Sequence, residues 1–307
     1  MSTFLTFNAY DKSMLDAIRH NNIQRVQQFL NHGADINRVD YTTMGTVGTP
    51  LHSAAMYGNK EIAEFLIDNG AYINQHNFYG NTPLLTATLY GKKEVAKLLL
   101  GKGADINQKN QVGNTPLHAT AMKSKNMDNI GNTELAELLI ERGSDINQIN
   151  DMGNTPLHLA AYYNYPEIAK FFINNGAHIN QINDIGNTPL HENIFNGNRE
   201  MVKLFIDNGA YINQANNKGD TPLHLAAYYG EDVIALLLIN AGANPFIKNK
   251  KNKTALDFAL TIKQLDDDEA REGKQKIAEL LKRYMSLYQG RSTSVFMKIY
   301  NFAMTIL

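Results

Sequence analysis

One tetrapeptide recurs along nearly the whole chain, and it constrains the fold more than any other feature. It reads Thr-Pro-Leu-His at 49–52, 115–118, 155–158, 188–191 and 221–224, with weaker copies at 82–85 and 254–257. The seven threonines are 33, 33, 40, 33, 33 and 33 residues apart. A fixed period of this length indicates stacked repeats, so we interpret the 307 residues as one elongated array and not as two globular domains.

Each part of the repeat has a physical role. Thr is a good helix N-cap, and Pro suits the first helical position because its missing N–H costs nothing there. Paired alanines, as in Ala160 and Ala161, let neighbouring helices approach closely. Glycines such as Gly58 end the first helix, and an amphipathic second helix follows, as in EIAEFLIDNG. A Gly-Ala or Gly-Ser pair and a polar turn rich in Asn and Gly complete the repeat.

These motifs resemble those of the ankyrin repeat family. The period, the Thr-Pro-Leu-His word, the paired alanines and the Gly-Ala-Asp-Ile-Asn ending at 103–107 all match. The resemblance covers 12–285, with repeats starting near 12, 49, 82, 115, 155, 188, 221 and 254. It implies an all-α solenoid of helix-turn-helix repeats with projecting β-turn loops and a concave face of turns and first helices. A segment 1–11 precedes this array, and an apolar tail 286–307 follows it.

Three repeats carry extra residues. Four lie in the turn after Gly33, seven lie near 123–132, and about ten lie at 263–276 before the second helix resumes at Ile277. We expect the acidic run 266–269 to be a solvated loop, because it lacks the spacing of a calcium-binding loop. Residues 294–307 carry one charge, Lys298, and are too few to span a bilayer as a helix. They could pack on the last repeat, anchor the chain to a membrane or partner, or be a disordered end.

Composition excludes several function classes. With no Cys, the chain has no disulfide, thiolate nucleophile or thiolate zinc site. A net charge of −1 argues against a general polyanion binder, and we expect no nucleic-acid partner. The N-terminus lacks the pattern of a secretory signal, and no apolar run reaches the roughly 20 residues of a transmembrane helix. We therefore expect a soluble monomer.

Residues that invite a catalytic or metal-binding interpretation have simpler explanations. The repeated histidines stand on successive helical repeats roughly 8 to 10 Å apart, whereas zinc needs ligand atoms about 2.0 to 2.1 Å from one centre. We predict that each imidazole bonds to backbone near its helix start and holds neighbouring turns together. No nucleophile, phosphate-binding or zinc-protease motif is present, so we expect no enzyme activity, no metal and no cofactor. The lysines at 248, 250, 251 and 253 form a solvated turn or a rim contact for an acidic partner.

Large apolar side chains are concentrated where the resemblance places the groove. Two positions follow the paired alanines, or the equivalent residues, of each first helix. Tyr and Met there suit a partner-binding surface because they combine apolar area with a polar handle. Some rings could instead pack on the next repeat, and apolar turn tips could stack on each other. The candidate partner-binding residues are Met56, Tyr57, Phe78, Tyr79, Leu89, Tyr90, Tyr162, Tyr163, Phe195, Tyr228 and Tyr229.

The sequence thus predicts a non-enzymatic scaffold that binds a partner protein in the concave groove. A membrane-associated adaptor anchored by the apolar tail is the alternative. Asn-rich chains of this kind are similar to ankyrin repeat proteins of intracellular bacteria, amoebae and large viruses, which implies a host-directed effector. The location would then be cytoplasmic, or inside a host cell after secretion without a recognisable signal peptide.

Overall fold

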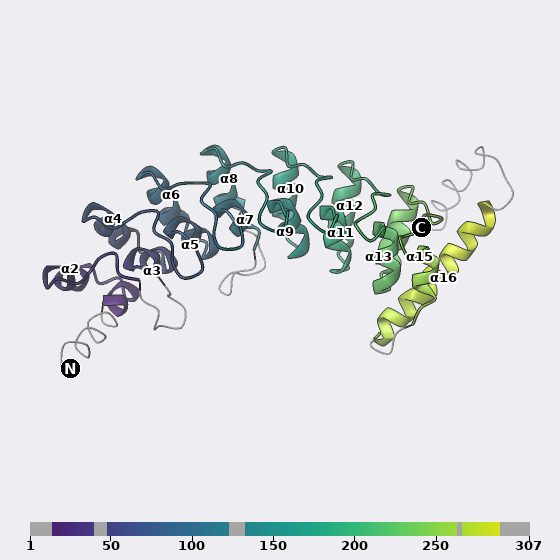
Figure 1. Ribbon diagram of the computed structural model, residues 1–307, viewed down its shortest axis with the longest axis horizontal. Helices are drawn as coiled ribbons and strands as arrows, with labels where there is room; N and C mark the ends of the chain where they lie inside the picture. The colour runs from purple at the N-terminus through teal and green to yellow at the C-terminus, as the bar shows by residue number, and fades with distance from the viewer. Residues whose placement is uncertain (1–13, 40–47, 123–132, 263–265, 289–307) are drawn as a thin grey trace. The chain divides into compact units, whose positions relative to one another are not determined.

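The structure is a computed structural model, and it describes residues 14–39, 48–122, 133–262 and 266–288 (Figure 1). Several expectations fall outside these ranges. They concern the segment 1–11, most of the turn that carries the four-residue insertion, the seven-residue insertion near 123–132, and the tail 294–307.

All regular elements within the described ranges are helices, which confirms the all-α prediction. After a helical stretch at 14–19, they are α2 (Ile23–Asn31), α3 (Pro50–Tyr57), α4 (Lys60–Asp68), α5 (Pro83–Leu89), α6 (Lys93–Gly101), α7 (Pro116–Thr120), α8 (Thr133–Glu141), α9 (Pro156–Tyr162), α10 (Pro166–Asn174), α11 (Pro189–Ile194), α12 (Arg199–Asp207), α13 (Pro222–Tyr229), α14 (Asp232–Asn240), α15 (Ala255–Ala259) and α16 (Asp268–Tyr288).

The helices begin where the sequence predicts. Thr49 caps α3 by accepting the His52 N–H on its hydroxyl oxygen (3.4 Å), and Pro50 occupies the first helical position. Thr82 caps α5 in the same way at 3.2 Å. Gly58 ends α3 with φ 82°, a conformation that a residue with a side chain adopts only at a cost.

The chain divides into two compact units, residues 1–159 and 160–307. In the N-terminal unit the first helices α3, α5 and α7 pack in succession, and the second helices α4, α6 and α8 form the other layer (Figure 1). In the C-terminal unit α11, α13 and α15 pack in succession, as do α10, α12 and α14. The core of each unit lies between the two layers and includes fully buried Leu51, Leu66, Val202 and Phe205.

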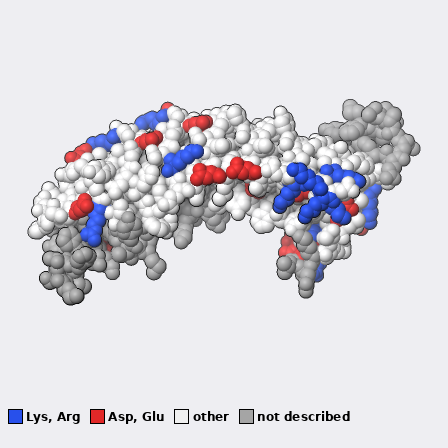
Figure 2. All heavy atoms as spheres, viewed as in Figure 1, with Lys and Arg blue, Asp and Glu red and all other residues white. Residues whose placement is uncertain are grey.

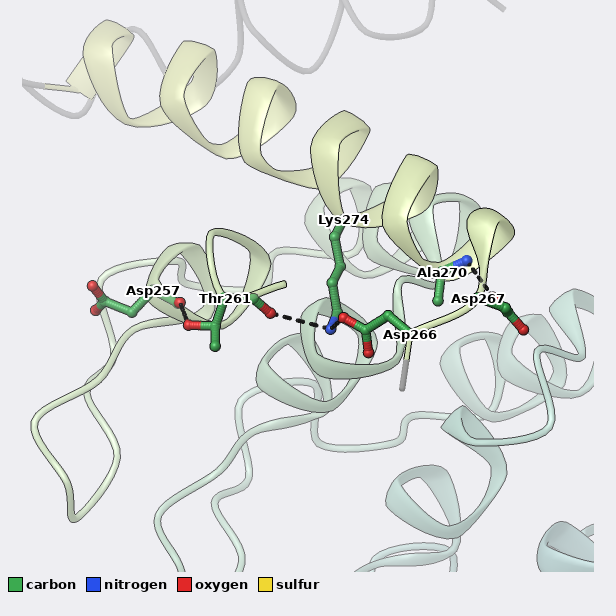
Figure 3. A network of polar contacts seen from close by, with 6 residues as sticks. All are labelled: Asp257, Thr261, Asp266, Asp267, Ala270 and Lys274. Carbon is green, nitrogen blue, oxygen red and sulfur yellow. Dashed lines mark hydrogen bonds and ion pairs between the residues drawn. The ribbon is translucent and has the colours of Figure 1, made fainter. Parts of the chain in front are cut away.

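The long helix α16 corrects the expectation for the last insertion. Residues 267–269 are exposed, as expected of a solvated loop, but Asp268 and Glu269 belong to a helix. Asp267 accepts the Ala270 N–H (2.8 Å), and α16 begins at Asp268 and packs against α13, α14 and α15. Asp266 instead bonds to the buried ammonium of Lys274 at 2.5 Å, as Figure 3 shows. The added residues therefore extend a helix that covers the last repeats of this unit.

Candidate partner-binding surface

Four histidines of the repeated motif each connect their repeat to the next. His52 Nδ1 accepts the Thr49 N–H (3.1 Å), and its Nε2 lies 2.8 Å from the Asn81 carbonyl of the following repeat. Because an N–H can only donate and a carbonyl can only accept, the ring must be neutral with its proton on Nε2. The same pair of bonds recurs at His118, His191 and His224. The predicted structural role of these histidines is confirmed.

Burial controls the ionisation of these rings. Removal from water lowers the pKa of His52, His118 and His191 to about 4, and it also lowers the pKa of His224. Asp257 takes the histidine position in α15 and accepts the Thr254 N–H at 2.8 Å. These hydrogen bonds lower the pKa of Asp257.

Turn asparagines form a second row of contacts between repeats that the sequence analysis did not foresee. Asn110 donates to the Asn81 side-chain oxygen of the preceding repeat (2.9 Å), and its own oxygen accepts the Val112 and Asn114 N–H groups. The equivalent pairs are Asn150 to Asn114, Asn216 to Asn187 and Asn249 to Asp220. Their signal in the sequence is an Asn at the same place in successive turns, but a turn favours Asn there whether or not it bonds to the next repeat.

In the N-terminal unit, the predicted surface residues differ in exposure. Phe78 and Tyr79 are 58% and 56% exposed and meet edge to face at 5.4 Å. Tyr57 is half-buried and packs against the hydrophobic core, so part of its ring has a structural role. Met56, Leu89 and Tyr90 are also half-buried. Burial raises the pKa of Tyr90, and the hydroxyls of Tyr57 and Tyr79 raise it further.

In the C-terminal unit, the structure brings most of the predicted aromatic residues into contact. Tyr162 and Tyr163 meet edge to face with centroids 5.0 Å apart. Phe195 meets Tyr229 of the next repeat at 5.2 Å, and Tyr229 meets Tyr228 at 4.9 Å. Phe195 stays 64% exposed and Tyr162 stays 52% exposed.

Tyr228 has a different environment from its neighbour. Its ring packs on Phe258 of the following repeat at 5.8 Å and lies 5.9 Å from the Lys274 ammonium. Its position matches the alternative of packing between repeats. Tyr228 therefore helps to hold the Tyr229 ring in place, and it could also contact a partner itself.

A cleft of about 660 Å³ opens beside Tyr229 in the C-terminal unit. It lies between α12, the start of α14 and the start of α16, and its polar lining includes Arg199, Glu231, Glu269 and Glu272. Burial raises the pKa of Glu231, and the negative charges of Glu269 and Asp232 raise it further. The aromatic surface thus borders an acidic recess.

Two exposed tyrosines were missed by the sequence analysis. Tyr72 and Tyr211 are 67% and 63% exposed. They follow the Gly-Ala pair, where other repeats carry Asp105 or Asp145. Replacement of that Asp by an aromatic residue was the available signal.

Over the described residues, no group of three His, Asp or Glu side chains is placed to hold a metal ion. No helix in those ranges is long and apolar enough to cross a membrane.

Comparisons with known proteins agree with this architecture. A family model described as ankyrin repeats in three copies matches residues 14–110, 103–183, 126–216 and 178–249. Among solved structures, the chain is similar to the human ASB11 ankyrin repeat domain, with 25% sequence identity and a TM-score of 0.64. That match covers 76% of this chain and 98% of the other.

Proposed function

Because the chain belongs to the ankyrin repeat family, whose repeats typically act as protein-interaction modules, we propose that it is a non-enzymatic module that binds a segment of a partner protein. The segment lies along the first helices and turns, where the family's groove is found. The module acts as a monomer, and its partner is neither nucleic acid nor membrane.

The observation that carries this proposal is the contact between Phe195 and Tyr229. Two aromatic rings from successive repeats meet at 5.2 Å, and Tyr228 supports one of them, yet Phe195 remains 64% exposed. An aromatic side chain that is held in place and exposed loses little conformational entropy on binding and offers a large contact area. Residues of this kind dominate the energetics of protein interfaces.

The test compares two sets of exposed aromatic residues. Replacing Tyr162 and Phe195 by Ala removes candidate contacts, and each should cost on the order of 2 kcal/mol of binding free energy if it is a hot spot. Replacing Tyr72 and Tyr211 by Ala is the matched control, because these rings are equally exposed but follow the second helices. Tyr228 is left intact because its ring supports the fold.

Affinity capture from cell lysates, followed by mass spectrometry and calorimetry with the recovered protein, provides the measurement. We expect partners that bind the wild type and the control variant and are lost with Tyr162→Ala/Phe195→Ala. If both variants retain the same partners at equal affinity, the assignment of this surface is wrong. Lysates of amoebal and animal cells test the host-directed role and the location that it implies.

The membrane-associated adaptor rests on the sequence of the tail alone, since residues 294–307 are outside the described ranges. Co-sedimentation of the full chain with liposomes is the test. The adaptor requires binding that is lost when residues 294–307 are deleted.

A further inference from the structure

Two adjacent turns of the C-terminal unit carry a cluster of exposed lysines. Figure 2 shows basic side chains gathered over the region that Figure 1 labels α13 and α15. We call this cluster the lysine tip, and it consists of Lys218 in the turn before α13 and Lys248, Lys250, Lys251 and Lys253 in the turn before α15.

The backbone beneath these lysines is held in place. The Lys250 N–H donates to the Lys218 carbonyl at 3.0 Å, which ties the two turns together. Asn249 accepts the Lys251 and Lys253 N–H groups, and it donates to Asp220 of the preceding turn. His224 bonds to the Lys253 carbonyl at 3.0 Å. The lysine stems thus project from a fixed base.

The tip lysines have no close ion-pair partner among the residues that the structure describes. None of the ion pairs between described residues involves a lysine of the tip, whereas Lys93, Lys102, Lys274 and Lys276 all have such partners. Asp220, an acidic residue of these turns, is 7% exposed and is bonded to Asn249. Asp257 is bonded to Thr254, and the positive charges of Lys253 and Lys248 also help to lower its pKa. Five lysines against these two hydrogen-bonded carboxylates leave a net positive charge, which favours binding of an anionic group.

One of the turn positions differs clearly from its equivalents. Lys218 and Lys251 stand two residues after the turn asparagine, where other turns carry Tyr79, Val112, Met152 and Ile185. A lysine at this position is therefore confined to these two turns, although Lys109 stands at the position that corresponds to Lys248.

We propose that the lysine tip binds an acidic segment, rich in Asp and Glu, of the partner protein. This inference rests on the proposed function and specifies the chemistry of the partner. The tip and the Phe195, Tyr228 and Tyr229 cluster come from neighbouring repeats, and Phe258, which contacts Tyr228, lies five residues after Lys253. One extended segment can therefore reach both surfaces.

A protein segment fits this surface better than a nucleic acid does. Single-stranded nucleic acids are bound on several stacking aromatic rings within a long basic groove, but these two turns carry only two aromatic residues, Tyr211 and Phe246. A lysine ammonium acts as a point charge, so it can bind a carboxylate without the fixed bidentate geometry of an arginine.

The probe is a fluorescent synthetic peptide of about ten residues rich in Glu, and its binding to the full chain is measured by anisotropy. Replacing Lys218, Lys250, Lys251 and Lys253 by Gln should weaken binding at least about tenfold, because several charge contacts are lost together. Replacing the exposed lysines Lys97, Lys170, Lys203 and Lys282 by Gln changes the net charge equally and should change binding less than about twofold. Binding should also weaken steeply between about 50 and 300 mM NaCl.

Three outcomes would overturn the proposal. They are no binding of the acidic peptide, equal losses in the two lysine variants, and tighter binding of a single-stranded oligonucleotide or phosphatidylserine vesicles of matched charge. The Tyr162→Ala/Phe195→Ala variant separates this inference from the groove assignment. The Glu-rich peptide lacks apolar anchors, so the variant should bind it as the wild type does even if the groove assignment fails.

Discussion

At the scale of single residues, the histidines show what a sequence can and cannot reveal. Their role near the helix start followed from the Thr-Pro-Leu-His word, since a ring three residues after an N-cap can reach its backbone. The second partner, such as the Asn81 carbonyl for His52, belongs to another repeat and depends on how repeats stack. Leu85 occupies the histidine position of its repeat, and the Thr82 cap is still formed there. A leucine side chain cannot make the hydrogen bond to the next repeat, so one repeat can lack that bond without losing its helix cap.

The buried histidines predict loss of stability in acid. Their folded-state pKa of about 4 is below the ordinary 6.5, so the unfolded chain binds protons first as the pH falls. Their contribution is complete above pH 6.5 and is lost between pH 6.5 and about 4, by at most about 3 kcal/mol per ring. Melting temperatures across this range should show the decline.

The variant His191→Leu tests the cause, because Leu occupies this position naturally at Leu85. It should be less stable than the wild type at pH 7.5 and should lose less stability on acidification. An unchanged slope in the variant would assign the pH dependence to other groups.

A second residue-scale prediction concerns the glycines of the turns. Gly186 has φ 77°, and a Cβ there would lie 2.5 Å from the Asn217 nitrogen of the next turn. Gly209 has φ 83° but would meet nothing within 4 Å. Replacement by Ala should cost about 1 kcal/mol at both sites, because both have positive φ. The contact with the next turn should add about 1 to 3 kcal/mol at Gly186.

Chemical denaturation of Gly186→Ala and Gly209→Ala measures this difference. If the two variants are equally destabilised, the neighbouring turns can move apart at little cost. The close approach of Gly186 to the next turn would then contribute nothing to stability.

At the scale of helices, the period predicted almost every first and second helix, whereas α16 was predicted only in part. The sequence placed a helix from Ile277 and a loop before it, yet the helix begins at Asp268. A loop and an exposed helical turn have the same polar composition, so composition could not separate them. Gly273 explains the packing: the helix passes so close to Gly230 that a Cβ at either glycine would overlap backbone of the other segment.

The buried pair of Lys274 and Asp266 should hold α16 in place. Their side chains are 1% and 13% exposed, and Lys274 also bonds to the Thr261 carbonyl (Figure 3). Lys274→Met leaves a buried carboxylate without its cation and should cost about 3 kcal/mol of unfolding free energy. Lys276→Met removes the exposed pairs with Glu272 and Asp232 and should cost less than about 1 kcal/mol.

Urea denaturation compares the two variants. The double variant Lys274→Met/Asp266→Leu should recover much of the loss, because no charge is then left buried. Equal costs for Lys274→Met and Lys276→Met would show that the buried pair has no special importance.

At the scale of the whole molecule, stability should be local. Each repeat contacts only its neighbours, so a lesion in one place should spread little. Lys274→Met should therefore speed amide exchange in α15 and α16 and leave that of α3 and α5 unchanged. Hydrogen exchange with mass spectrometry resolves these helices, and faster exchange in α3 would contradict the nearest-neighbour view.

The candidate surface was less predictable than the fold. Position after the paired alanines, or after their equivalents in the repeat, identified Tyr162 and Phe195, which are exposed. The same rule could not separate them from Tyr57, which packs on the core, or Tyr228, which packs on Phe258. Whether a ring is exposed depends on the size of the side chains in the neighbouring repeat. The position of a residue within its repeat carries no information about those side chains.

The hydrogen bonds between repeats show where additional residues can be inserted into such a chain. His52, His191 and His224 each bond to a carbonyl 29 residues ahead, whereas His118 reaches one 36 residues ahead at a similar distance. Asn150 and Asn114 likewise bond at 2.8 Å across 36 residues. The seven additional residues thus leave the interface unaltered. A tag or a reporter domain can therefore be inserted between α7 and α8, at the site of these seven residues. The hydrogen bonds between this repeat and the next should keep their geometry.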